Sequence, residues 1–136
     1  MLTPDDRGAI ADLLAAYSFG YDMMEWDLYS SIWTEDAVVV GTGGETLAAV
    51  MVGLARAWRE DLAGKGIQTR HSQTNTLFEE MTSEFASART LMFVAHQHAG
   101  EAAPRLVHSG VYHDQFRKTA GGWKIARREV VIDHPW

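Results

Sequence analysis

The stretch Tyr21-Asp22-Met23-Met24-Glu25-Trp26-Asp27 lies at the junction of two predicted helices, and the predicted fold is arranged around it. Apolar and aromatic residues recur upstream of it at helical spacing: Ile10, Leu13, Leu14, Tyr17 and Tyr21. Steps of four residues from Leu14 reach Ser18 and then Asp22, so Asp22 lies close to this apolar stripe. A lone buried carboxylate is costly, and we therefore expect Asp22 to have a partner.

The N-terminal half is predicted to be mainly helical. Thr3 is the expected cap of the first helix, because its hydroxyl can accept an orphan backbone N–H. Proline follows it at the first helical position, and two aspartates in the first turn complement the helix dipole. The predicted elements are a helix over 5–24, a short helix between 25 and 36, a buried strand over 37–40, a flexible turn over 41–44 and a helix over 47–62, whose apolar periodicity runs through Val50, Leu54 and Trp58.

The C-terminal half has four long stretches typical of strands, separated by residues that favour turns. These predicted strands cover residues 67–81, 87–98, 105–119 and 123–133. Helices followed by an antiparallel meander predict an α+β domain. A strongly curved mixed or antiparallel sheet wrapped over the helices would form a cone with one open mouth. Neither a repeat nor a linker divides the sequence, so residues 1–136 are predicted to be a single domain.

Composition narrows the functional classes. The chain has 136 residues and no cysteine, which excludes disulfides, thiolate metal sites and cysteine nucleophiles. The net charge of −6 argues against nucleic acid or an anionic membrane as the main partner. The sequence shows neither a secretory signal nor the roughly 18 apolar residues that a membrane span needs. We therefore expect a cytoplasmic protein with room for one core and one internal pocket.

His71 is the expected partner of Asp22. Residues of one parity share a face of a strand, so His71, Gln73, Asn75 and Leu77 are predicted to line up together. If they face the cone, Asp22 would hold one imidazole nitrogen and direct the other toward a ligand, as a general base requires. Two simpler alternatives stay open: Asp22 as a cap or ion-pair partner at the helix junction, and His71 as a hydrogen-bonded strand histidine.

The order of elements resembles the NTF2-like, or SnoaL-like, superfamily over essentially the whole chain. Within it, Tyr21-Asp22, the segment His71-Ser72-Gln73-Thr74-Asn75 and the late Gly121-Gly122-Trp123-Lys124 resemble scytalone dehydratase-like proteins. The resemblance implies a catalytic dyad of Asp22 and His71, and a second pocket histidine at His96, with His98 as the less favoured register. It implies no metal and no cofactor, although Asp22 and the histidines are of a type that zinc or iron accepts.

The resemblance has departures. Val39-Val40-Gly41 stands where scytalone dehydratase carries a further tyrosine. The hexachlorocyclohexane dehydrochlorinase of the same group has a lysine shortly before its aspartate, and Tyr17–Tyr21 contains none here. Its arginine position falls near Thr119, with Arg117 and Lys118 close by. These differences argue against dehydrochlorination.

The predicted activity is that of a cofactor-independent lyase of the dehydratase type. His71 would remove a proton α to an electron-withdrawing group of a small hydrophobic cyclic or aromatic molecule, and a β-leaving group would depart. The residues expected to bind substrate are Tyr21, Trp26, Asn75, His96 and His108. An isomerase or polyketide cyclase using the same base is the alternative. A non-catalytic binding or assembly module, such as a small dioxygenase subunit, is the second alternative. It predicts no enclosed Asp–His contact and a sheet buried against a partner, and a cone filled by side chains would also favour it.

The sequence pattern also predicts residues of the surface. Thr90, Met92 and Val94 are predicted to lie on the outer sheet face, where they would support a homodimer or a homotrimer. The charged groups around Arg59 and Arg128 are predicted to be solvated or at an interface, in keeping with the usual place of charges.

Overall fold

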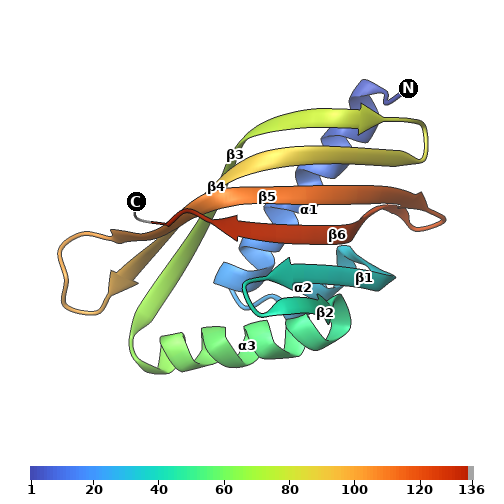
Figure 1. The fold of residues 1–136 in the computed structure, drawn as a ribbon. Coiled ribbons are helices and arrows are strands. Elements are labelled where there is room, and N and C mark those ends of the chain that lie inside the picture. Colours follow the sequence, from blue (N-terminus) through green and yellow to red (C-terminus); the bar gives the residue numbers. More distant parts are fainter. Residues whose placement is uncertain (135–136) are drawn as a thin grey trace.

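Three helices and a six-stranded sheet make up the computed structural model, which describes residues 1–134 (Figure 1). The elements are α1 (Pro4–Asp22), α2 (Trp26–Ser31), β1 (Trp33–Gly41), β2 (Gly44–Leu47), α3 (Ala48–Gly64), β3 (Ile67–Met81), β4 (Phe85–His98), β5 (Arg105–Thr119) and β6 (Gly122–Ile132). The predicted α+β class is confirmed, and two of the predicted strands coincide with β3 and β5.

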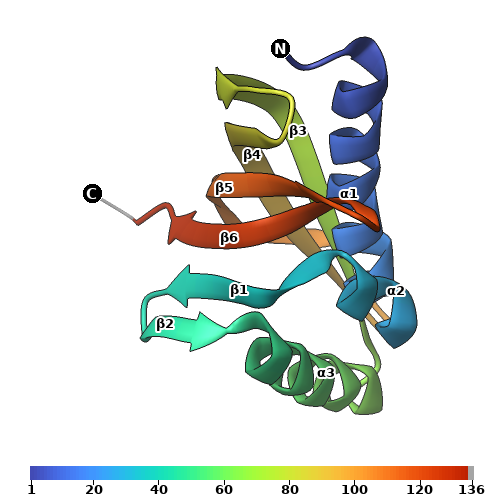
Figure 2. The ribbon, with the colours of Figure 1, turned by 90° about the vertical axis from the view of Figure 1, so that its right-hand side faces the viewer.

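The sheet has the strand order β2-β1-β6-β5-β4-β3. It is mixed, because β1 pairs with β6 in parallel while the other neighbours are antiparallel. The helices lie on one face: α1 crosses the strands, and α3 lies below β1 and β2 (Figure 2). One core cluster packs α1 against β4, β5 and β6, and a second joins β1 to α3. Between them the helices and the sheet separate, which leaves space for the cavity described below.

A capping box begins α1. The Thr3 hydroxyl accepts from the Asp6 backbone N–H, and the Asp6 carboxylate accepts from the Thr3 backbone N–H. The same carboxylate also accepts from Trp123 Nε1 at 2.8 Å and from Lys118 Nζ at 2.9 Å. Asp6 therefore ties the start of α1 to the turn between β5 and β6.

We expect Asp6→Asn to lower the melting temperature at neutral pH, and this loss to shrink in acid. Hydrogen bonds from Trp123, Thr3 and Lys118 hold the pKa of Asp6 below its usual range. The unfolded chain therefore takes up this proton first, and the stabilisation is lost as the pH falls from about 4 toward the lower folded pKa. Melting curves of both proteins from about pH 7 to about pH 3 measure the effect. Asp5→Asn, an exposed change in the same turn, is the control; an Asp6→Asn deficit that stays constant with pH would contradict this role.

The β1–β2 hairpin differs from the sequence prediction. The flexible turn expected over residues 41–44 is a two-residue loop between paired strands, and β1 is longer than the predicted strand over 37–40. Of the hairpin glycines, Gly44 has the left-handed φ of +103° that favours glycine. The sequence does not predict the short strand β2, because its four residues, Gly-Glu-Thr-Leu, carry little hydrophobic pattern.

A bulge in β3 reverses the predicted side-chain alternation. Asn75 has φ of +55°, and the pairing with β4 shifts between Thr74 and Leu77. His71 and Gln73 face the helices as predicted, but Asn75 and Leu77 are exposed. The extra residue turns Thr76 and Phe78 toward the interior instead. The predicted row of inward residues is therefore correct only as far as Gln73.

The outer face of β4 was also assigned to the wrong residues. Thr90, Met92 and Val94 are 0%, 4% and 4% exposed and face the helices, whereas Leu91 and Phe93 are exposed. Since alternate residues point to opposite faces, a one-residue error exchanges the two faces completely.

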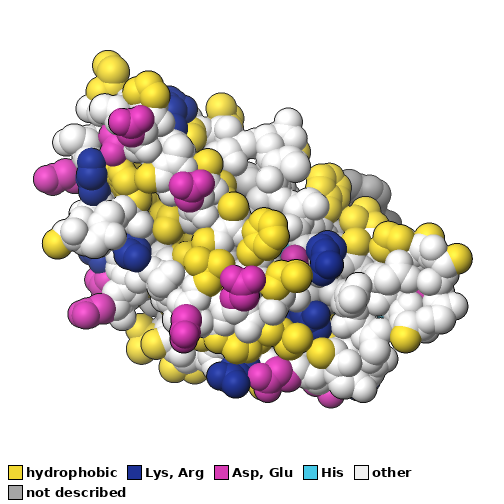
Figure 3. Space-filling view, turned by 180° about the vertical axis from the view of Figure 1, so that it is seen from behind, with side chains coloured by type: hydrophobic (Ala, Val, Ile, Leu, Met, Phe, Trp, Pro, Cys, Tyr) yellow, Lys and Arg dark blue, Asp and Glu magenta, His cyan; other side chains and the backbone are white. Residues whose placement is uncertain are grey.

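Acidic, basic and apolar side chains are interspersed on the face that carries α1 (Figure 3). Within residues 1–134, no helix combines the length and the apolar character that crossing a membrane requires.

Candidate active site

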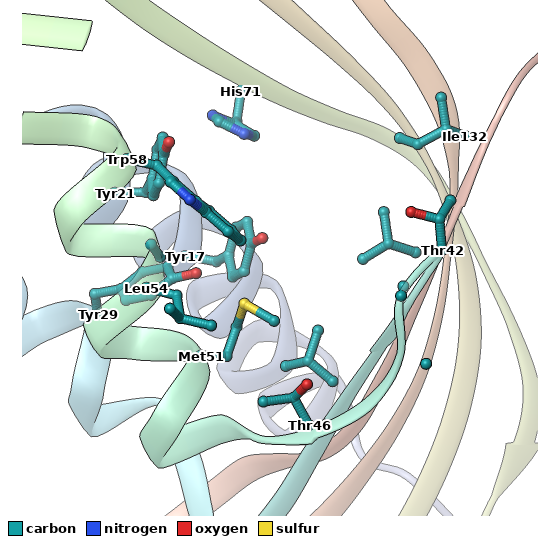
Figure 4. Close-up of a pocket in the computed structure, with 16 residues that line it drawn as sticks. Tyr17, Tyr21, Tyr29, Thr42, Thr46, Met51, Leu54, Trp58, His71 and Ile132 are labelled. Atoms are coloured by element: carbon teal, nitrogen blue, oxygen red, sulfur yellow. The ribbon is translucent and has the colours of Figure 1, made fainter. Parts of the chain in front are cut away.

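A cavity of about 460 Å³ lies between the helices and the inner face of the sheet (Figure 4). Its walls come from α1, α2, α3, the β1–β2 hairpin, β3 and the end of β6. The lining residues are Tyr17, Tyr21, Tyr29, Val39, Gly41, Thr42, Gly43, Gly44, Thr46, Met51, Leu54, Ala55, Trp58, His71, Val130 and Ile132. Small-molecule sites commonly have volumes of roughly 300–1,000 Å³, so the cavity has the size of a ligand site.

Asp22 and His71 meet at one end of this cavity. Asp22, the last residue of α1, is 5% exposed, and His71 on β3 has a side chain that is 14% exposed. The distance from His71 Nδ1 to Asp22 Oδ1 is 2.8 Å. The predicted contact is thus confirmed, and His71 Nε2 is left without a hydrogen bond from any described residue. The ring is therefore oriented with one nitrogen bound and the other available.

Further hydrogen bonds fix the Asp22 carboxylate. It accepts from the Thr69 hydroxyl at 2.7 Å and from the His71 backbone N–H at 2.6 Å. Burial alone would raise the pKa of Asp22, but His71 and Thr69 together lower it below its usual range. Asp22 is therefore a fixed anion with both oxygens occupied, suited to orienting His71 and to balancing its positive charge after protonation.

Arg59 secures the backbone around Asp22. It was predicted to be solvated, yet it is 3% exposed. Its guanidinium donates to the Asp22 carbonyl oxygen at 3.2 and 3.3 Å and to the Ile67 carbonyl oxygen at 3.1 Å. The arginine thus connects the end of α1, α3 and the start of β3 at the point where the dyad forms.

All four tyrosines of the chain gather beside the dyad. The Tyr21 ring meets the His71 ring edge-on, with centroids 4.9 Å apart, and Tyr17 lies 6.1 Å from His71. The Tyr17 hydroxyl points into the cavity (Figure 4). Burial, followed by the neighbouring Tyr17, raises the pKa of Tyr21 to about 12, so this phenol keeps its proton and can donate a hydrogen bond.

The other predicted ligand-binding residues do not line the cavity. Trp26 packs edge-on against Tyr21 and Tyr29 and faces a shallow depression outside it. Asn75 is exposed at the β3 bulge, and His108 is exposed on β5. His96 is half-buried opposite Thr69, and burial followed by the neighbouring histidines lowers its pKa. Of the five predicted residues, the structure thus brings only Tyr21 to the cavity.

Comparison of the sequence with protein-family models shows a match to the SnoaL-like domain over residues 3–129. The chain belongs to the SnoaL-like domain family. The resemblance inferred from the sequence is thereby confirmed. No curated protein sequence matches the chain.

Solved structures with the same fold include three informative neighbours of this SnoaL-like domain. ActVI-ORFA from Streptomyces coelicolor has a TM-score of 0.83 and 20% identity, with 96% of each chain covered. An NTF2-like protein with a cystatin-like fold from Novosphingobium aromaticivorans has a TM-score of 0.81 and 23% identity, covering 94% of this chain and 82% of its own. A candidate scytalone dehydratase from the same organism has a TM-score of 0.75 and 20% identity, covering 97% of this chain and 89% of its own. At these identities the similarity establishes the NTF2-like fold alone.

The SnoaL-like domain also holds a buried ion pair that sequence reasoning missed. Arg128 is 0% exposed, and its Nε and Nη2 donate to the two oxygens of buried Asp114, each at 2.8 Å. Its guanidinium carbon lies 4.2 Å from the Tyr17 ring centroid and 3.9 Å from that of Tyr112. Nη2 also donates to Gln73 Oε1 at 3.0 Å, so the pair links three strands to the tyrosine cluster beneath the cavity.

Two further residues of the site were not identified from the sequence, although each has a visible signal. Tyr17 lies one turn before Tyr21, which places both phenols on the face that ends at Asp22. Trp58 belongs to the apolar periodicity that predicts this helix, together with Val50 and Leu54; all three are exposed, and Leu54 and Trp58 border the cavity. Among residues 1–134, no group of three or more His, Asp or Glu side chains is placed to hold a metal ion.

Proposed function

We propose that this SnoaL-like domain is a general-base enzyme that removes a proton from a carbon next to a carbonyl group. The observation that carries the proposal is the 2.8 Å contact between His71 Nδ1 and the buried Asp22 carboxylate, at the wall of an apolar cavity. The non-catalytic alternative predicts no such contact and a sheet buried against a partner, and a filled cone would favour it. The described residues have both an open cavity and the contact, which argues against it.

A hydro-lyase is the reaction that we favour, with a β-hydroxy ketone as substrate. His71 Nε2 takes the α-proton, and the electrons of the broken C–H bond form an enolate. Tyr17 and Tyr21 are placed to donate hydrogen bonds to its oxygen. The enolate then expels the β-hydroxyl group, which takes the proton from the imidazolium and leaves as water. A C=C bond has formed, His71 is neutral again, and no oxidant or reductant is consumed.

An isomerase is the second candidate, and the tyrosine cluster is the observation that favours it. Neutral phenols beside the base would hold an enolate long enough for His71 to return the proton to a different carbon. A polyketide cyclase would use the same base and the same donors. These reactions differ from dehydration in that no water leaves.

We expect the protein to convert 3-hydroxy-1-tetralone, a bicyclic β-hydroxy ketone, into 1-naphthol with the loss of one water. Mass spectrometry and naphthol fluorescence follow the product. In deuterated water, unchanged mass apart from incorporated deuterium would favour the isomerase. If this ketone and a panel of cyclic ketones show neither elimination nor enzyme-dependent deuterium exchange, the general-base proposal is wrong.

A further inference from the structure

The cavity wall indicates the charge of the ligand. Of the described residues that line it, none is Asp, Glu, Lys or Arg, and His71 and three tyrosines are the only ionisable groups. A carboxylate or phosphate bound here would lose its hydration without meeting a cation, which costs several kcal/mol. The ligand is therefore expected to be neutral when it binds, with its polar atoms at the end that carries His71.

One rim of the cavity mouth is an exposed apolar stripe on α3. Val50, Leu54 and Trp58 follow at intervals of one turn and are 53%, 42% and 56% exposed. Leu54 and Trp58 also line the cavity, so their surface is continuous with its interior. Contiguous apolar surface on a soluble protein commonly marks a binding site, and this stripe leads directly to the mouth.

The opposite rim is formed by three glycines and Thr42. Thr42 and Trp58 lie on opposite sides of the cavity (Figure 4), and Gly41, Gly43 and Gly44 line it beside Thr42. A Cβ atom added at Gly41 or Gly43 would meet nothing within 4 Å, and neither residue has a positive φ. The backbone therefore does not require glycine at these two positions. Glycine at these positions leaves the space across the cavity from Trp58 free of side chains that other residues would place there.

We propose that Trp58 and the Gly41–Gly44 hairpin form a slot that takes a flat ring, so that the substrate is a neutral fused-ring ketone. Its enolisable end lies at His71, and its distal ring lies against Trp58. This inference rests on the proposed function and adds the class of substrate. Burial of the half-exposed indole by an aromatic face would contribute both apolar area and stacking.

Affinities of three neutral probes test the slot: phenol, 2-naphthol and 9-phenanthrol, measured by calorimetry with the purified protein. We expect affinity to rise with each added ring in the wild type. Trp58→Ala should weaken 9-phenanthrol about tenfold and leave phenol nearly unchanged, because only the larger probe reaches the mouth. Trp58→Phe should restore most of the difference. Gly43→Val, in a position with free space, should also discriminate against the largest probe.

Val50→Ala is the matched control, since it removes apolar surface from the same stripe at a residue that does not line the cavity. It should leave all three affinities unchanged. Two outcomes in Trp58→Ala would overturn the slot: an equal loss of affinity for phenol and 9-phenanthrol, or no loss for either. Wild-type affinities that do not depend on ring number would overturn it as well. Binding requires no turnover, so these outcomes are independent of whether His71 acts as the base.

Discussion

Replacing His71 with glutamine is expected to lower kcat for 3-hydroxy-1-tetralone by about 10²–10⁴, because a positioned general base contributes that much to a proton transfer. Glutamine keeps a polar side chain of similar length that can still contact the Asp22 carboxylate. It has no basic nitrogen to accept the α-proton. Initial rates of naphthol formation measure the effect, and the circular dichroism spectrum should be that of the wild type.

Asp22→Asn is the companion variant, and it should also lose most of its activity. The amide cannot balance the charge of a protonated His71, and it places an NH₂ group where the carboxylate accepts three hydrogen bonds. Gln97→Glu, on the distal part of β4 and away from the cavity lining, is a control that changes charge and should retain activity. Wild-type kcat in His71→Gln would remove this residue from the base role and leave Asp22 as a structural anion.

The sequence predicted the elements that depend on long, regular patterns. The bounds of β3 and β5 follow from strand-like runs between clear turns. Helical spacing and a buried acid's need for a partner predict that Asp22 is paired, and the resemblance to scytalone dehydratase-like proteins implies His71 as that partner. The prediction failed where one residue changes the register. At Asn75 the left-handed backbone inserts a bulge, which a strict period of two cannot represent.

Buried charges were the second source of error. Arg59 and Arg128 are fully buried, although arginine is seldom found in this state without a partner. Their partners are backbone carbonyls for Arg59 and Asp114 for Arg128, and neither partner is adjacent in sequence. On α3, apolar residues are exposed where the pattern would bury them: Leu54 and Trp58 border the cavity mouth. The buried face of this helix contains Ala55 and Arg59 instead.

Asp114→Ala should be the most destabilising single change in the sheet, lowering the free energy of unfolding by about 3–5 kcal/mol. The cost arises because Arg128 remains fully buried after its counter-charge is removed, with Gln73 Oε1 as its remaining hydrogen-bond acceptor among the described residues. Urea denaturation measures it as a lower midpoint. Glu79→Ala is the matched control, because it breaks the exposed Glu79–Arg89 pair of the same sheet, and exposed pairs contribute only about 0–1 kcal/mol.

The double variant Asp114→Leu with Arg128→Met separates stability from function. Replacing both charges with apolar groups leaves no uncompensated ion, so stability should recover to within about 1–2 kcal/mol of the wild type or exceed it. The cation beneath the Tyr17 ring would then be absent from a folded protein. If the pair serves to hold Tyr17 toward the cavity, this stable variant should still lose kcat, whereas unchanged kcat would restrict Arg128 and Asp114 to packing. If the double variant is as stable as the wild type but has a lower kcat, the fold does not require the ion pair. Its role would then be to position Tyr17.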